Sequence, residues 1–325
     1  MARAKRRLGV IGTFVWDTIH GRDPRAGPVE EWGGVTYALS GLDAALSEEW
    51  EIVPLIKVGA DLAPRAREYV ATLRRMAPDA PLVEVPYPNN RVELRYETSE
   101  RRCERLTGGV PGWTWLGLKP LLAGLDALYI NFLSGWEMEL ETCQLVRQHF
   151  RGPIYCDLHM LVMAVQSTGW RTPTPLPNAA EWCRCFDLLQ MNEDEMATIA
   201  ADPLGLAATA MAAGVRCLIV TMGSRGAVYF ATSDFDRIAD LAAPRPMGAA
   251  TGPVRTELVP SSARSTEGDP TGCGDVWGAT CFSRLLSGDT LGPAMRAANA
   301  AAAKNLEYRG ATGLSRHLRG ELSLR

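Results

Sequence analysis

The chain has 325 residues, of which 46% are hydrophobic and 22% are charged, and its formal net charge is −3. This composition is typical of globular proteins and argues against a disordered chain. No long run of Lys or Arg could neutralise many phosphates, so nucleic acid is not an expected partner. No apolar run approaches the roughly 20 residues that span a bilayer, so we expect a soluble protein that does not bind membranes.

The N-terminal segment and the cysteines both indicate the cytoplasm. The basic residues within 3–7 lead into an apolar stretch that is too short for the core of a signal peptide. The eight cysteines are scattered and lack the paired spacing of a zinc site or the density of a disulfide scaffold. We therefore predict reduced thiols and a cytoplasmic location.

Short apolar segments alternate with helical patterns along most of the chain, which is typical of an α/β fold with a mostly parallel central sheet covered by helices on both faces. Several segments are apolar throughout, as strands buried on both faces require. We predict strands at 8–12, 52–58, 127–131, 154–157, 188–191 and 217–221. One domain over residues 1–325 fits these elements, although the length would also allow two.

Helical spacing of apolar residues predicts two further elements. Asp61 is expected to cap a helix over 62–76, with Pro64 in its first turn. A second helix over 291–306 carries one apolar stripe among small residues. Both patterns indicate helices that pack on the sheet.

The segment 91–97 differs, because charged and apolar residues alternate with a period of two. This pattern predicts a strand with one buried and one solvated face. Together with 29–32 and 103–106 it would form a small antiparallel sheet that stands away from the main sheet. We predict such a lid, inserted from about 14–34 and 86–108, with an edge hairpin of the main sheet as the alternative.

The segment Gly268–Asp275, with the sequence GDPTGCGD, carries the clearest chemical signal and precedes a helix predicted at 276–286. Without side chains, Gly272 and Gly274 let backbone amides approach a phosphate, and the helix dipole adds positive potential. A carboxylate there would ordinarily repel an anion, but Asp275 is explained if it takes a proton from a hydroxyl while the amides hold a phosphoryl group. The alternative is a Gly-rich turn in which Asp275 only caps the helix.

This octet resembles the second signature of the PfkB carbohydrate kinases, the ribokinase-like family. The resemblance implies that Gly272, Cys273 and Gly274 supply an anion hole and that Asp275 is the catalytic base. Further segments match in the family's order. They imply ATP contacts by Asn192, Thr221, Gly223 and Asn299, and binding of Mg²⁺ through water by Glu195.

The N-terminal half resembles the family at the acceptor site. Asp17 falls where the family binds substrate hydroxyls, and Gly33 and Gly34 resemble its Gly-Gly pair. Two departures concern the acceptor. Ala38 replaces the Asn that is usual in kinases of ribose, and 157–161 lacks the Asn and Arg of the Asp-x-Asn-x-Arg found in many sugar kinases.

The resemblance has two further implications. Asp269 and Thr271 match a monovalent-cation site opposite the loop 309–312, so potassium is expected to raise activity. The apolar face of the lid strand, with Val92, Leu94 and Tyr96, either covers the site or pairs with a second subunit. Dimerisation through the lid is common in the family, so a homodimer through the lid is one of the two alternatives, and the oligomeric state stays open.

The sequence thus predicts a kinase that moves the γ-phosphate of ATP to a hydroxyl of a sugar, nucleoside or similar small polyol. The absence of Gly-x4-Gly-Lys-Ser/Thr and of Gly-x-Gly-x-x-Gly disfavours a P-loop kinase and a dehydrogenase. The alternative is a catalytically idle relative that binds a nucleotide or metabolite as a regulator or subunit. Retention of Asp275 weighs against it, because binding alone does not need a base.

Overall fold

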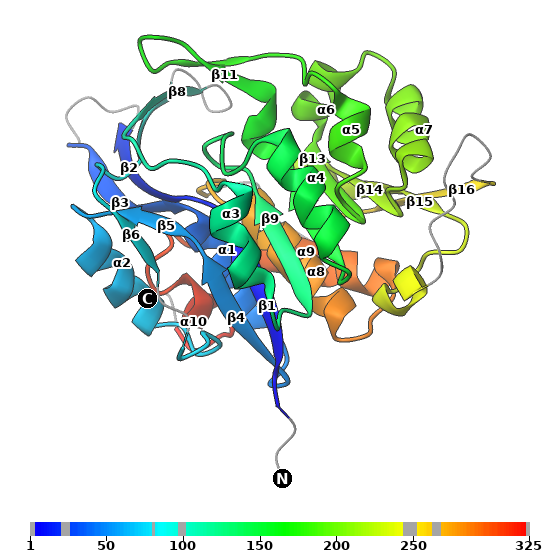
Figure 1. The fold of residues 1–325 in the computed structure, drawn as a ribbon, viewed down its shortest axis with the longest axis horizontal. Helices are drawn as coiled ribbons and strands as arrows, with labels where there is room; N and C mark the ends of the chain where they lie inside the picture. The colour runs from blue at the N-terminus through cyan, green and yellow to red at the C-terminus, as the bar shows by residue number, and fades with distance from the viewer. Residues whose placement is uncertain are drawn as a thin grey trace.

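In the computed structural model the residues described are 4–20, 27–79, 82–96, 102–242, 252–261 and 268–322. An eight-stranded sheet, with the order β16-β15-β14-β13-β10-β9-β1-β4, forms the centre (Figure 1). Its parallel strands are β1 (Arg6–Ile11), β4 (Trp50–Leu55), β9 (Ala127–Asn131), β10 (Ile154–Asp157), β13 (Leu188–Asn192) and β14 (Cys217–Thr221). Antiparallel strands β15 (Ala227–Thr232) and β16 (Val254–Val259) complete one edge. The predicted fold class is confirmed.

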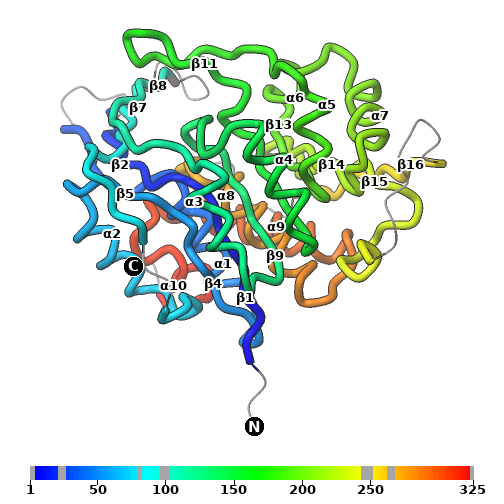
Figure 2. Tube along the Cα trace, viewed as in Figure 1, coloured from blue at the N-terminus to red at the C-terminus, as the bar shows by residue number. Residues whose placement is uncertain are grey.

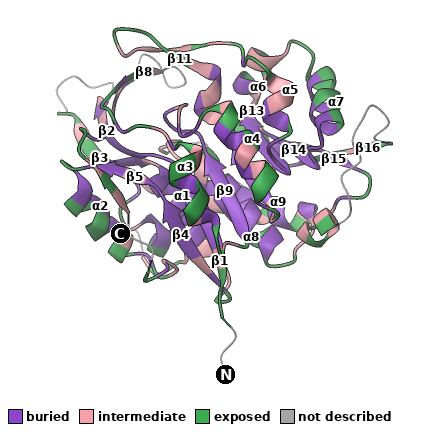
Figure 3. Ribbon diagram, viewed as in Figure 1, coloured by how far each residue is buried: buried purple, intermediate pink, exposed green. Residues whose placement is uncertain are grey.

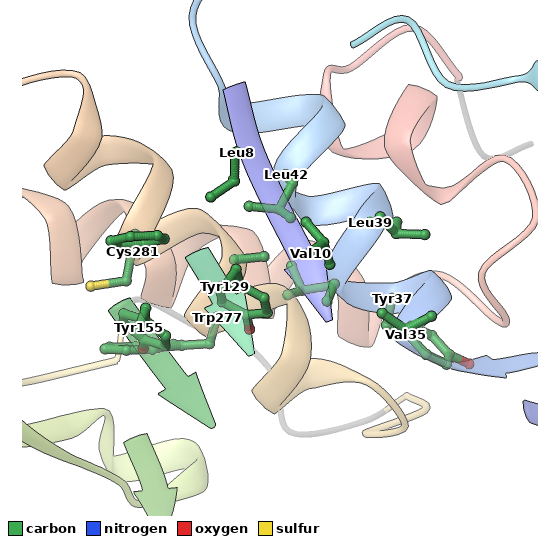
Figure 4. Packing of buried hydrophobic residues seen from close by; sticks show 14 of the residues in the cluster. Leu8, Val10, Val35, Tyr37, Leu39, Leu42, Tyr129, Tyr155, Trp277 and Cys281 are labelled. Atoms are coloured by element: carbon green, nitrogen blue, oxygen red, sulfur yellow. The ribbon is translucent and has the colours of Figure 1, made fainter. Parts of the chain in front are cut away.

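Helices cover both faces of this sheet, because its strands are apolar on both sides. Tyr129 and Tyr155 point into one core, and Ile130 and Cys156 point into the other. The first core is shared with α1 (Val35–Ala45), α2 (Ala63–Ala71), α8 (Cys273–Leu286), α9 (Leu291–Leu306) and α10 (Leu314–Leu318). The second is shared with α3 (Trp115–Leu118), α4 (Leu140–His149), α5 (Ala179–Cys183), α6 (Glu193–Ile199) and α7 (Pro203–Ala213). Buried strands between partly exposed helices are visible in Figure 3, and Figure 4 shows the first core.

A four-stranded sheet, called the lid here, lies beside the main sheet (Figure 2). Its order is β3 (Val29–Gly34), β2 (Phe14–His20), β7 (Arg91–Tyr96) and β8 (Arg102–Thr107). The outer pairs are antiparallel, whereas β2 and β7 run parallel. In the described part of the chain, no lid strand pairs with the main sheet, so the edge-hairpin alternative is wrong.

Short elements connect these layers. The paired strands are β5 (Lys57–Gly59) with β6 (Val83–Val85) and β11 (Met163–Val165) with β12 (Arg171–Pro173). Short 3-10 segments are η1 (Lys119–Leu122), η2 (His159–Val162), η3 (Gly223–Arg225) and η4 (Ile238–Ala242). The hairpin of β11 and β12 reaches the lid, where Leu106 donates its backbone N–H to the Gly169 carbonyl at 2.8 Å.

The predicted cap of α2 is wrong. Leu62 occupies the N-cap position, and no side chain caps the helix. Asp61 instead accepts hydrogen bonds from the Asn89 amide at 2.7 Å and from Arg91 at 2.8 Å. Asp61 therefore joins the helix entrance to the base of the lid, because a bond from a charged donor is stronger than a cap bond.

The eight cysteines, all within the described ranges, form no disulfide, and six of them are buried. In the described ranges, no single helix has the length and apolarity to cross a membrane, while α6 and α7 meet that test only as a pair bent by 80°.

Candidate active site

A cleft of about 780 Å³ lies between the lid and the carboxyl ends of β10, β13 and β14. Ligands of open α/β sheets bind at such strand ends. Of the predicted site residues, the cleft is lined by Asp17, Gly34, Asn192, Glu195, Thr221, Gly223, Thr271, Gly272, Cys273, Gly274 and Asp275. Gly33, Asp269 and Asn299 lie outside this lining.

Asp275 occupies the first turn of α8 and faces the cleft. The helix is capped by Gly272, which has no side chain, so the alternative in which Asp275 is the cap is wrong. Asn131, fully buried at the end of β9, donates from Nδ2 to Asp275 Oδ1 at 2.5 Å. This bond holds the carboxylate in one orientation, and the sequence analysis did not single out Asn131.

The turn before α8 requires glycine at position 272. Gly272 has a φ of 74°, and a Cβ there would lie 2.1 Å from the ring of Tyr37. The Cys273 amide closes the turn by donating to the Pro270 carbonyl at 3.1 Å. The Gly274 amide has no hydrogen-bond partner among the described residues. The predicted anion hole therefore depends on Gly274 more than on Cys273.

The Cys273 side chain turns away from the cleft toward α9. Its thiol donates to the Ala302 carbonyl at 3.5 Å, and Asn305 donates to its sulfur at 3.2 Å. Burial raises the pKa of Cys273 to about 11, so the thiol is neutral near pH 7. This residue fixes the turn and supplies no nucleophile.

Gln190, which the sequence did not single out, ties the turn to the sheet. Its Nε2 donates to the Gly274 carbonyl and to Asp157 Oδ2, each at 3.1 Å. Its Oε1 accepts from the Tyr155 hydroxyl at 2.6 Å. Gly278 makes room for this network, because a Cβ there would lie 2.2 Å from Oε1. Gln190 thus positions Gly274, whose amide belongs to the predicted anion hole.

Asn192 and Glu195 form a capping box at the start of α6. Asn192 Oδ1 accepts from the Glu195 amide at 2.8 Å, and Glu195 Oε2 accepts from the Asn192 amide at 2.8 Å. Glu195 Oε1 accepts from Asn192 Nδ2 at 2.7 Å and contacts His159 Nδ1 at 2.9 Å. With three of about four acceptor positions occupied, Glu195 retains room for one water, which fits an outer-sphere metal contact.

His159 stands where many sugar kinases would have an Asn. Burial alone would lower the pKa of His159, but the hydrogen bond with Glu195 and the charges of Asp157 and Asp275 raise it to about 9. The imidazole is therefore a cation near pH 7. Burial raises the pKa of Asp157, and His159 counteracts this.

A second cavity of about 250 Å³ continues from the cleft and shares Thr221, Gly223 and Gly274 with it. Its far wall is formed by Trp277, Asn299, Ala302, Ala303 and Leu306. Asn299 accepts from Trp277 Nε1 at 2.7 Å and donates to the carbonyls of Val259 and Pro260. Its amide protons are thus occupied, so Asn299 shapes this cavity and has no N–H left for a base.

Asp17 lies within β2 at the opposite end of the cleft and is 6% exposed. A Cβ at Gly33 would lie 1.8 Å from Asp17 Oδ2, so only glycine leaves space for this carboxylate. Gly34 has a φ of 61° and starts α1. The Gly-Gly pair therefore supports Asp17 and the entrance of α1, and only Gly34 borders the cleft.

The predicted cation residues lie close to a further carboxylate. Asp269 Oδ1 accepts from the Thr271 amide at 3.0 Å. Glu31, from lid strand β3, reaches Gly310, where a Cβ would lie 1.7 Å from Glu31 Oε1. Burial and then the charge of Asp269 raise the pKa of Glu31, and the charge of Arg309 offsets part of this rise. A cation between Asp269 and the 309–312 loop would relieve this repulsion.

Comparisons with known proteins agree with this architecture. Residues 159–317 match the pfkB family carbohydrate kinase model. No curated protein matches the chain in sequence. Among solved structures, Arabidopsis thaliana ribokinase complexed with ribose and ATP has a TM-score of 0.67 and 14% identity, covering 99% of this chain and 100% of that one.

Two other structures have different substrates. Burkholderia thailandensis nucleoside kinase in complex with inosine has a TM-score of 0.68 and 14% identity, covering 97% of this chain and 95% of that one. A pyrophosphate-dependent kinase of the ribokinase family, complexed with a pyrophosphate analog and myo-inositol, has a TM-score of 0.70 and 16% identity, covering 93% and 96%. The fold is ribokinase-like, and residues 159–317 are similar to the pfkB family carbohydrate kinases.

Proposed function

We propose that the protein is an ATP-dependent phosphotransferase that moves the γ-phosphate to a hydroxyl of a sugar, nucleoside or similar small polyol. One observation carries this proposal: Asp275, oriented by Asn131, lines the same cleft as the Gly274 amide and Asp17. A base, an anion-binding turn and a hydroxyl-binding carboxylate are the groups that in-line phosphoryl transfer needs.

The second cavity supports ATP as the donor. A donor made only of phosphates would need no largely apolar space beyond the anion-binding turn, whereas a nucleoside triphosphate must place its base somewhere. Thr221 and Gly223 border both cavities, as contacts to the phosphates or ribose would require. Asn192 and Glu195 would hold Mg²⁺ through water, and the bound ion would supply positive charge to the phosphates.

The chain's own residues account for the acceptor chemistry. Asp17 accepts a hydrogen bond from the acceptor and orients it, and Asp275 removes the proton from the attacking hydroxyl. The Gly274 amide and the positive end of α8 stabilise charge on the transferred phosphoryl group. The proton passes to Asp275, the new P–O bond forms on the acceptor, and ADP leaves.

The alternative, a catalytically idle binding protein, is weakened by the contact in which Asn131 holds the Asp275 carboxylate toward the cleft. A protein that only binds nucleotide gains nothing from a carboxylate held beside the phosphate site, since that charge opposes binding.

The test is transfer from γ-labelled ATP, and separately from labelled pyrophosphate, to a panel of sugars, nucleosides and inositol. We expect a phosphorylated acceptor with ATP and magnesium. Transfer from pyrophosphate alone would overturn the donor assignment. Tight ATP binding without transfer to any member of the panel would favour the idle protein.

A further inference from the structure

The acceptor end of the cleft extends across three neighbouring lid strands. Asp17 on β2 pairs with Val92 on β7, and Leu94, two residues further along β7, pairs with Glu104 on β8. Side chains two residues apart on a strand share a face, so Asp17 and Glu104 both face the cleft that they line. Two strand spacings and two residues of rise separate their backbones by roughly 12 Å. The two carboxylates therefore mark opposite ends of this part of the cleft, and an acceptor that contacts both must extend along it.

The space between these carboxylates is apolar. Val92 and Leu94 line it from the lid, and both are buried in the lid's own apolar cluster. Leu133 and Met160 line the same cleft from loops of the core. Aliphatic walls offer no hydrogen bonds, so the part of the acceptor that lies here is an apolar face such as that of a flat ring.

A buried ion pair lies at the end of this apolar space that is nearest to β8. Arg171 Nη1 lies 3.0 Å from Glu104 Oε2, with side chains 3% and 10% exposed. Arg171 Nη2 also donates to the Leu133 carbonyl at 2.8 Å, which places Leu133 beside the pair. Because Glu104 already compensates the guanidinium, the described residues here offer no surplus positive charge to an acidic or phosphorylated acceptor. A carboxylate accepts hydrogen bonds, so it suits the N–H or O–H donors of an acceptor and not its carbonyl groups.

We propose that the acceptor is a nucleoside whose ribose hydroxyls bind Asp17, whose base lies along Val92 and Leu94, and whose base N–H groups donate to Glu104. This inference rests on the proposed kinase function and names its substrate class. Arg171 acts as a positioning residue that holds Glu104 against the cleft.

The experiment compares nucleosides with methyl β-D-ribofuranoside, which has the same hydroxyls and lacks the base. Inosine, guanosine, adenosine and cytidine are tested as substrates with ATP, and as ligands by calorimetry with a non-hydrolysable ATP analogue. At least one nucleoside should have a KM and a Kd more than tenfold below those of the methyl riboside. Equal or weaker nucleoside binding would overturn the inference.

Glu104→Gln isolates the contribution of the base. A hydrogen bond to a charged acceptor predicts a loss of about tenfold or more in nucleoside affinity, with methyl riboside affinity unchanged. The matched control is Glu93→Gln, since Glu93 lies on the neighbouring strand, pairs with Arg95 at 2.6 Å and lies outside the cleft lining. This control should leave both affinities unchanged. Equal losses for both ligands in Glu104→Gln would mean that Glu104 only supports the lid.

If Glu104→Gln unfolds because Arg171 loses its partner, the double variant E104Q/R171Q keeps a hydrogen-bonding pair without charges. The same nucleoside-selective loss is expected in it, and its absence counts against the inference. The outcomes also separate the two proposals. Phosphorylation of a sugar or inositol, but no nucleoside, leaves the kinase standing and overturns the nucleoside assignment. Nucleoside binding that depends on Glu104 without any turnover leaves this site standing and overturns the kinase.

Discussion

The two ends of the cleft are built differently. The donor end is formed by core strand ends and the turn before α8, where Gln190, Asn131 and the capping box of Asn192 and Glu195 tie polar groups to the sheet. The acceptor end is formed by lid strands and the β11–β12 hairpin, with aliphatic walls and one ion pair. The family model matches residues 159–317, which contain the donor end except Asn131 and none of the four lid strands.

This contrast shows which part of the site is constrained by chemistry. Every donor presents the same phosphates, so the turn, its glycines and the base have few alternatives. Acceptors differ in shape, so lid side chains can change while the lid strands stay in place. Variants at each end should therefore affect different kinetic constants.

The largest expected effect is at the donor end. Asp275→Asn keeps the shape and removes the base, so transfer should slow by about 10² to 10⁴, which corresponds to roughly 2.7 to 5.4 kcal/mol of barrier. ATP affinity should hold or rise slightly, because a negative charge beside the phosphates is lost. Asp194→Asn, which removes another carboxylate from the cleft lining, should stay within a few-fold of wild type. A folded Asp275→Asn with wild-type turnover would remove Asp275 as the base.

The next effect belongs to the acceptor end. Asp17→Ala removes a charged acceptor of hydrogen bonds, a loss of roughly 1.5 to 3 kcal/mol. Acceptor affinity should fall more than tenfold while ATP affinity holds, as measured by titration calorimetry. Thr18→Ala, on the next residue and the other face of β2, is the control. Equal losses for ATP and acceptor would show that the two ends are not separate sites.

A monovalent cation would test the contrast between the donor and acceptor ends, because its predicted site lies between the lid and the turn before α8. Glu31 comes from the lid, and Asp269 from the turn before α8. We expect potassium to raise kcat several-fold over tetramethylammonium, since a cation would offset the repulsion between the two carboxylates. Glu31→Gln should weaken this response. Equal rates in sodium, potassium and tetramethylammonium would contradict the site.

The smallest effect concerns the base of the lid. Burial raises the pKa of Asp61, but hydrogen bonds from the Asn89 amide and Arg91 outweigh burial and lower it. A lowered pKa in the folded state gives stability that is present above the unfolded value and is lost as the pH falls through the folded pKa. Since the Asp61 side chain is 38% exposed, solvent screening limits this to below about 1 kcal/mol.

Denaturant unfolding of Asp61→Asn checks this expectation. The variant should be slightly less stable than wild type at pH 7, and the difference should shrink as the pH falls below about 4. A difference that grows on acidification would have the wrong sign and would exclude an ionised Asp61 as a lid contact.

The donor end could be predicted from the sequence, because glycines at a fixed spacing before a helix indicate a backbone turn that depends only on neighbouring residues. The turn at Gly272 requires its positive φ regardless of the rest of the chain. The roles of Asn131 and Gln190 could not be predicted from the sequence, because they depend on β9, β10 and β13 being neighbours in the sheet. A polar residue ending a buried strand was the one available signal.

The lid was readable only in part. The alternation in 91–97 predicted β7, and in the structure this strand spans Arg91–Tyr96. The segment of β2 falls within the predicted lid bounds 14–34, but it was not predicted as a strand. Only Gly12 and Thr13 separate it from β1, and both of its faces are mostly buried, so it lacks the alternation of a half-exposed strand. The contact of Arg171 with the lid could not be predicted, because Arg171 lies on a hairpin 67 residues beyond its partner Glu104.

Position 37 illustrates a limit on engineering this cleft. Tyr37 lies in the first turn of α1, just after Gly34. Its ring packs against Gly272, in the turn that is proposed to bind phosphate. One side chain therefore underlies both the acceptor entrance and the phosphate-binding turn. A library that varies Tyr37 to broaden acceptor range will also disturb the donor, whereas Val92 and Leu94 offer positions that touch only the acceptor side.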